Sequence, residues 1–147
     1  MKKLILALAI GFSMVVSASE AYSFEDKKED VRELVKIQAE KNNIPLDFAY
    51  ALIYVESRFE PKVRGKKGEY GLGQILCSTA KSMGYVGKCD GLKDPETNLK
   101  YAMLYLKWAL DEANGDVCHA AAIYSSGNTK KPRRPTAYCK LVLSQMK

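Results

Sequence analysis

The four cysteines of this 147-residue chain constrain its fold more than any other sequence feature. Cys77, Cys89, Cys118 and Cys139 all follow an N-terminal segment typical of export, and an even number of cysteines in a small exported domain indicates two disulfides. Of the three possible pairings we favour Cys77–Cys89 and Cys118–Cys139, because each closes a short local loop and would stabilise the fold by about 3 kcal/mol. A zinc site is disfavoured, since no two cysteines lie two to four residues apart and His119 is the only histidine.

The N-terminal segment has the pattern of a secretory signal peptide. Lys2 and Lys3 precede an apolar run over residues 4–16, and small residues follow up to Ala21. The run is shorter than the about 20 residues that a membrane span needs, so a signal peptide over residues 1–21 is favoured over an uncleaved anchor. Cleavage after Ala18 or after Ala21 fits the pattern. We therefore expect a periplasmic or secreted protein with one domain over residues 22–147 and no stable membrane span after cleavage.

The chain is moderately basic, with 23 lysines and arginines against 17 aspartates and glutamates. This balance suits an anionic partner, although an equally good interpretation is that the charge only keeps the protein soluble. Nucleic acid is disfavoured as a partner because of the export signal. We expect a monomer that uses no cofactor and no metal.

The spacing of apolar residues predicts a mainly helical fold with little or no sheet. Asp94 and Asp116 are placed to cap two of the helices, and Pro95 suits a first helical position. The segments 59–69 and 129–135 are rich in charge, glycine or proline and are expected to be loops. The expected helices cover residues 25–42, 46–57, 78–83, 95–113, 116–126 and 136–146.

Glu56 is the residue whose position most directly suggests chemistry. It follows Leu52 by four residues, at the end of an apolar helix face that includes Phe48 and Ala49. Burying a charged carboxylate is costly, and one resolution is a raised pKa that keeps the group protonated near neutral pH. Such a carboxyl group is what a glycosidase uses to protonate a leaving sugar oxygen. Spacing alone nevertheless favours the simpler alternative, in which Glu56 points into water or pairs with Arg58.

Three sequence motifs favour the catalytic interpretation of Glu56 over the solvated one. They are Glu56-Ser57-x-Phe59-x-Pro61, then Gly71-Leu72-Gly73-Gln74-Ile75 followed by Ser78-Thr79-Ala80, and finally Ala122-Ile123-Tyr124-Ser125-Ser126-Gly127. Asp94-Pro95-x-x-Asn98 and Tyr105-Leu106 lie between the last two. In this order and spacing the motifs resemble the catalytic domain of the soluble (SLT, family 1) lytic transglycosylases, which shares a core with goose-type lysozyme. The resemblance covers roughly residues 30 to 145.

The resemblance implies a lysozyme-like helical domain that cleaves peptidoglycan glycan strands. Glu56 would be the single catalytic acid and base, acting between N-acetylmuramic acid and N-acetylglucosamine and leaving 1,6-anhydro ends. Glu69 flanks the glycine motif and could line the cleft, although a solvated loop is the simpler interpretation. The residues expected to bind substrate are Ser57, Glu69, Gly73, Gln74, Tyr124 and Ser125.

Two departures from the family pattern bear on the cleft. Gly73 stands where many relatives have methionine, which would remove an apolar contact for sugar and widen the cleft. Ser125 replaces the usual asparagine and shortens the reach of a polar group. Two alternatives stay open: a lysozyme-type hydrolase on the same scaffold, and a non-catalytic peptidoglycan-binding module of an envelope assembly. A role beside a secretion, pilus or conjugation system would suit the small size of the chain.

Overall fold

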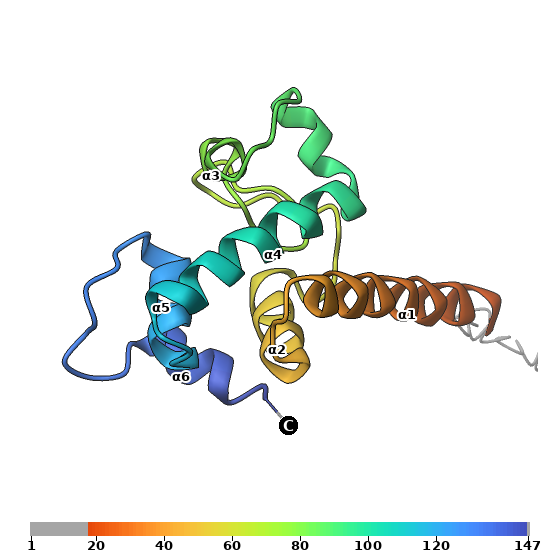
Figure 1. The fold of residues 1–147 in the computed structure, drawn as a ribbon. Helices are drawn as coiled ribbons and strands as arrows, with labels where there is room; N and C mark the ends of the chain where they lie inside the picture. The colour runs from red at the N-terminus through yellow and green to blue at the C-terminus, as the bar shows by residue number, and fades with distance from the viewer. Residues whose placement is uncertain (1–17, 147) are drawn as a thin grey trace, which may run out of the picture.

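The structure, a computed structural model, describes residues 18–146, so most of the predicted signal peptide lies outside the described residues. The elements follow in the order α1 (Ala18–Lys41), α2 (Leu46–Ser57), α3 (Cys77–Ser82), the 3-10 helix η1 (Cys89–Lys93), α4 (Pro95–Glu112), α5 (Val117–Ser126) and α6 (Ala137–Leu143) (Figure 1). Within residues 18–146 the only β-type pairing is two isolated bridges, which join Tyr70 to Arg64 and to Ile75. The mainly helical prediction is confirmed. None of the described helices is long and apolar enough to cross a bilayer.

Helix α4 is the central helix of the fold. Its start was predicted correctly: Asp94 accepts a hydrogen bond from the Thr97 amide at 2.8 Å, and Pro95 occupies the first helical position. Its buried face, which includes Leu99 and Leu106, packs into the main core. α4 contacts α1, α3, η1 and α5, and Figure 1 shows it crossing the middle of the molecule.

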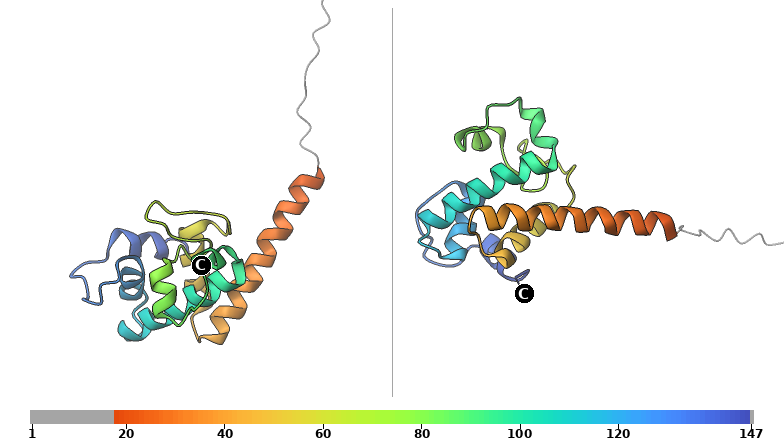
Figure 2. Two further views of the ribbon diagram at one scale, coloured as in Figure 1. Left: turned by 90° about the horizontal axis from the view of Figure 1, so that it is seen from above. Right: turned by 45° about the vertical axis from the view of Figure 1, so that its right-hand side comes forward.

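Two helix boundaries differ from the prediction by more than one residue, and one short helix was not predicted. α1 begins at Ala18, before the predicted start at Glu25, because an existing helix extends at the gain of one hydrogen bond per residue. The apolar positions on which the prediction rested lie further along, and Figure 2 shows the first turns of α1 projecting away from the other helices. α6 ends at Leu143 instead of Met146. η1 was not predicted, since five residues around Gly91 show no helical period.

The two disulfides join neighbouring elements in different parts of the fold. Cys77–Cys89 ties α3 to η1, with 5.4 Å between the Cα atoms, beside a small apolar cluster that includes Leu92. Cys118–Cys139 ties the start of α5 to the start of α6, with 5.0 Å between the Cα atoms, at the edge of the main core. Both are the pairings favoured from loop length, and no cysteine among the described residues is free.

Asn98, on the first turn of α4, links three separate segments by hydrogen bonds. Its side chain is completely buried. The amide Nδ2 donates to the carbonyl oxygens of Tyr70, at 2.7 Å, and Leu92, at 2.9 Å. Its Oδ1 accepts from the Gly73 amide at 2.8 Å. One side chain therefore fixes the irregular glycine loop, η1 and α4 relative to one another.

Gly71 lies so close to this amide that no side chain fits there. A Cβ atom at Gly71 would come within 2.8 Å of Asn98 Nδ2, and the backbone has a φ of +60°. Glycine is the residue that adopts this left-handed conformation without a steric cost. The first glycine of the motif is thus explained by the approach of Asn98.

We expect Asn98→Leu to destabilise the fold strongly. Leucine has a similar volume but leaves two carbonyl oxygens and one amide without their buried partner, which should cost about 3–5 kcal/mol in the free energy of unfolding. Urea denaturation followed by circular dichroism measures this cost. Asn128→Leu is the matched control, since Asn128 is exposed and should change stability by less than about 0.5 kcal/mol. Equal midpoints for the two variants would contradict the role assigned to Asn98.

Candidate active site

Glu56 lies in the last turn of α2 and its carboxyl group lines a cavity of about 280 Å³. After Ser57 the chain reverses sharply, with Arg58 and Phe59 in left-handed conformation at φ values of 54° and 63°. Phe59 is buried in the core and holds this reversal in place. The side chains that share the cavity with Glu56 include Lys66, Glu69, Gln74, Tyr124, Ser125 and Tyr138.

Three effects act on the carboxyl group of Glu56. Burial is the largest and raises its pKa. The hydroxyl of Tyr138 donates a hydrogen bond to Glu56 Oε1 and lowers the pKa, whereas the negative charge of Glu69 raises it. The result is a pKa of about 7 against an ordinary value of 4.5. A carboxyl group with this pKa is partly protonated at neutral pH and can both give and take a proton.

Tyr138 was not predicted as a site residue. It lies 82 residues after Glu56, and from the sequence we assigned it to the apolar face of the last helix. Burial and the charge of Glu56 raise the pKa of its phenol far above the ordinary value, so it stays a hydrogen-bond donor. One sequence signal was available: Tyr138 precedes Cys139, whose predicted partner Cys118 starts the helix that carries Tyr124.

Glu69 faces the same cavity from the loop opposite α2. Its Oε2 accepts a hydrogen bond from the Lys67 amide at 2.9 Å. A Cβ atom at Gly65 would lie only 2.1 Å from that oxygen, so the glycine leaves the space that the carboxylate occupies. Glu69 is thus held by the loop backbone and lines the same cavity as Glu56.

Gln74 completes this wall of the cavity. Its Nε2 donates to the carbonyl oxygens of Gly71, at 2.9 Å, and Val63, at 3.2 Å, which leaves its amide oxygen as an acceptor at the cavity. The backbone of Gln74 has a φ of 45°, an unfavourable value for a residue with a side chain. Strain of this kind concentrates at functional sites, where the surrounding structure maintains it.

Tyr124 lies under the cavity between α5 and the glycine loop. It is buried, and its hydroxyl donates to the Gly73 carbonyl oxygen at 2.7 Å. Burial, and then the charge of Glu56, raise its pKa well above the ordinary value. Beyond Tyr124 and the exposed Ser125 a second cavity of about 270 Å³ continues along Thr79, Tyr105 and Gly127. The two cavities share Glu69, Gln74, Tyr124 and Ser125, so together they form one cleft.

Two of the residues expected at the cleft lie outside it. Ser57 is buried, and its hydroxyl donates to the Ile53 carbonyl oxygen of its own helix at 3.1 Å. Gly73 lines neither cavity, and a Cβ atom there would lie 2.3 Å from the Cβ of Ala102. Its lack of a side chain therefore permits close packing of the loop on α4, and the expected widening of the cleft has no counterpart in this geometry.

No cluster of three or more histidine, cysteine or carboxylate side chains suited to a metal ion occurs among the described residues. The chemistry that the cleft itself offers is proton transfer by Glu56, next to the carboxylate of Glu69 and the hydroxyl of Tyr138. Neutral acceptors and donors, from Gln74 and Ser125, lie along the same wall.

The sequence of this chain is similar to those of known proteins. Residues 33–137 match the family model "Transglycosylase SLT domain". The soluble lytic murein transglycosylase of Escherichia coli K12 is 30% identical over 101 residues, which make up 65% of this chain and 16% of the relative.

Two solved structures share the fold. The 70 kDa soluble lytic transglycosylase of Escherichia coli aligns with a TM-score of 0.61 and 26% identity, over 78% of this chain and 19% of that one. An inactive mutant of the lytic transglycosylase Slt of Pseudomonas aeruginosa gives a TM-score of 0.63 at 21% identity, over 78% of this chain and 20% of that one. The chain therefore spans about a fifth of these much longer proteins.

We expect Glu69→Gln to lower the pKa of Glu56. The substitution removes a negative charge that raises this pKa, so the carboxyl group should ionise below pH 7, closer to its ordinary value of 4.5. Carbon-detected NMR titration of the Glu56 carboxyl group measures the change. Glu60→Gln is the matched control, because Glu60 is an exposed loop carboxylate outside the cleft. A Glu56 pKa that is the same in both variants would show that Glu69 does not act on it.

We expect Tyr138→Phe to change the same pKa in the opposite direction. Without the hydroxyl that favours the ionised form, the Glu56 pKa should rise above about 7. The same NMR titration reports it. Tyr101→Phe serves as the control, since Tyr101 packs edge-on against Tyr85 and lines neither cavity of the cleft, so it should leave the Glu56 pKa unchanged. A lowered pKa in Tyr138→Phe would contradict the hydrogen-bond assignment.

Proposed function

Because the chain belongs to the transglycosylase SLT domain family, we propose that it is a peptidoglycan lytic transglycosylase with Glu56 as its catalytic acid and base. The observation that carries the proposal is a carboxyl group with a pKa of about 7 inside a polar cleft. A general acid works best when its pKa lies near the working pH, because it is then both present as the acid and strong enough to donate.

The proposed reaction is an internal transfer that consumes no water. Glu56 donates its proton to the glycosidic oxygen between N-acetylmuramic acid and N-acetylglucosamine, and the bond to the anomeric carbon breaks. The carboxylate that results then takes the proton from the C6 hydroxyl of the muramic acid, whose oxygen attacks its own anomeric carbon. A 1,6-anhydro end forms, and Glu56 is protonated again for the next cycle.

The neighbours of Glu56 would support both halves of this cycle. The Tyr138 hydroxyl donates a hydrogen bond to one carboxyl oxygen and would leave the other free to face the cleft. The negative charge of Glu69 raises the Glu56 pKa and would help the Glu56 carboxylate to take the proton from the C6 hydroxyl. Gln74 and Ser125 would bind acetamido and hydroxyl groups of the sugar along the cleft. Tyr124 would act from below, by holding the Gly73 carbonyl and hence the loop.

A lysozyme-type hydrolase is the second candidate, and Glu69 is the observation that favours it. Most glycosidases use two carboxyl groups, the second of which activates water or binds the sugar covalently. Glu69 lines the same cavity as Glu56 and could hold a water molecule there. The products separate the two reactions, since hydrolysis leaves reducing ends and transglycosylation leaves 1,6-anhydro ends.

The setting of the enzyme also remains a proposal. The signal pattern over residues 1–21 supports export to the periplasm or beyond, with residues 22–147 as the working domain. The proposed task is local opening of the cell wall for a secretion, pilus or conjugation machine. A non-catalytic binding module is the remaining alternative, and it would have no use for a titrating carboxyl group in the cleft.

We expect Glu56→Gln to abolish release of soluble muropeptides from purified sacculi, lowering the rate by at least about 100-fold, since general acid catalysis contributes this much or more. Mass spectrometry of the released fragments should show 1,6-anhydro ends for the wild type. The variant should fold at least as stably above pH 7, because the neutral amide avoids the cost of ionising a buried carboxyl group as pH rises from about 4.5 to 7.

Glu60→Gln provides the matched control and should release fragments at the wild-type rate. Reducing ends in place of anhydro ends would support the hydrolase instead. Equal clearing of sacculi by the wild type and Glu56→Gln would exclude Glu56 as the catalytic acid. If the folded wild type released no fragments at all, the non-catalytic binding module would be the function supported.

A further inference from the structure

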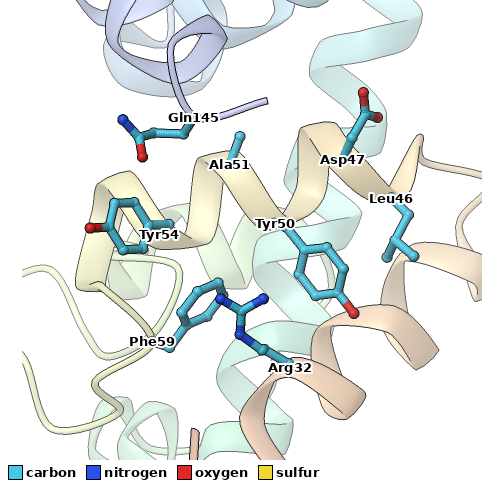
Figure 3. A pocket seen from close by; sticks show the side chains of 8 residues that line it. All are labelled: Arg32, Leu46, Asp47, Tyr50, Ala51, Tyr54, Phe59 and Gln145. Carbon is cyan, nitrogen blue, oxygen red and sulfur yellow. The ribbon is translucent and has the colours of Figure 1, made fainter. Parts of the chain in front are cut away.

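A separate cavity lies away from the cleft. It measures about 490 Å³, and we call it the aromatic pocket; it is lined chiefly by Arg32, Leu46, Asp47, Tyr50, Tyr54 and Phe59 (Figure 3). It shares no lining residue with either cavity of the cleft. Ala51 and Gln145, the latter from the segment after α6, complete its wall.

Helix α2 separates the aromatic pocket from the cleft. Tyr50 and Tyr54 are four residues apart and so lie on one face of the helix. Glu56 follows Tyr54 by two residues, which places it about 200° further round the helix, on the opposite face. The same helix thus carries the carboxyl group of the cleft on one side and the aromatic pocket on the other.

The rings of the pocket form a connected apolar surface. Phe59 packs edge-on against Tyr50, with ring centres 6.3 Å apart, and lies 5.9 Å from Tyr54. Phe59 is buried, whereas Tyr54 is 39% exposed and is the one exposed aromatic side chain among residues 29–146. The apolar C–H face of a pyranose ring packs well on such a surface, because it covers the ring while the sugar hydroxyls stay at the rim.

Polar groups surround this surface. The guanidinium group of Arg32 lies over the Phe59 ring, 4.6 Å from its centre, and 5.8 Å from the centre of Tyr50. The Arg32 side chain is exposed, and its guanidinium group carries five N–H donors that can bind a ligand. Figure 3 shows Arg32 beside the rings and Asp47 and Gln145 beyond the helix on the other rim. A few polar groups around an apolar floor are typical of small-ligand sites.

We propose that the aromatic pocket is a second glycan site, which binds an N-acetylated sugar unit bearing a carboxylate on a peptidoglycan strand other than the one in the cleft. The proposal rests on the function proposed above. The rings pack against the pyranose face, and Arg32 binds the carboxylate. Two sites on one molecule raise the effective concentration of the enzyme at a wall of many parallel strands.

Size and surroundings favour a saccharide over a protein partner. A volume of about 490 Å³ lies within the range of small-ligand pockets. Stable protein interfaces need about 800 Å² on each partner, with several exposed apolar residues around a centre. The other exposed large apolar side chains of the described residues lie outside the pocket: Ile37, Leu76, Val86, Leu141 and Leu143.

The test is an NMR titration of the Glu56→Gln protein with the soluble disaccharide N-acetylglucosaminyl-N-acetylmuramic acid. Two separate sets of amide signals should shift, one around the cleft and one around Arg32, Tyr50 and Tyr54. Adding Tyr54→Ala should weaken binding at the second set by about tenfold, the equivalent of one lost aromatic contact, and leave the first set unchanged. Leu141→Ala, at an exposed apolar residue outside both sites, should change neither.

The second-site proposal and the catalytic proposal can fail independently of each other. The second site is overturned if the pocket signals do not shift, if Tyr54→Ala binds as tightly as its parent, or if only a stem peptide without sugar shifts them. If the wild type releases no muropeptides but the pocket signals shift, the catalytic proposal fails while the binding site stands. In an active enzyme, Tyr54→Ala should raise KM on intact sacculi several-fold and leave kcat on short soluble strands unchanged.

Discussion

The hydrogen bonds of one buried amide hold the irregular part of this fold together. Between α2 and α4 the chain forms only the short helices α3 and η1 and two isolated bridges, so many of its backbone groups need partners from elsewhere. Asn98 supplies three of them at once, from a helix that is itself fixed in the core. The Gly73 carbonyl oxygen in turn accepts a hydrogen bond from the Tyr124 hydroxyl, which fixes the loop to α5 as well. A loop without a sheet or long helix thereby becomes a rigid wall facing Glu56.

The candidate site is built from three segments that lie far apart in the sequence. Glu56 comes from α2, Tyr138 from α6 and Glu69 from the loop. Burial and the charge of Glu69 raise the Glu56 pKa, whereas the Tyr138 hydrogen bond lowers it. Burial alone would raise the pKa and leave the carboxyl group a weak acid, and the Tyr138 hydrogen bond alone would lower the pKa and leave the carboxylate a weak base. The value near 7 is a balance that requires all three segments at their present distances.

Local signals in the sequence predicted much of this arrangement, and contacts between distant segments explain the rest. The caps at Asp94 and Asp116 and the two disulfides depend on nearby residues, and they were predicted correctly. The bond from Tyr138 to Glu56 spans 82 residues, and no periodicity encodes it. Gly73 shows the same limit: the sequence marks the glycine, but only the position of Ala102 explains why a side chain is excluded.

The place of the second disulfide beside Tyr138 affects when the site becomes complete. α6 has seven residues, and a helix of this length is not stable by itself. The bond from Cys139 to Cys118 anchors it to α5, and with it the phenol that contacts Glu56. In a reducing compartment, where this bond does not form, α6 would rely on packing alone. The Cys118–Cys139 bond therefore links the redox state of the surroundings to how firmly Tyr138 is held beside Glu56.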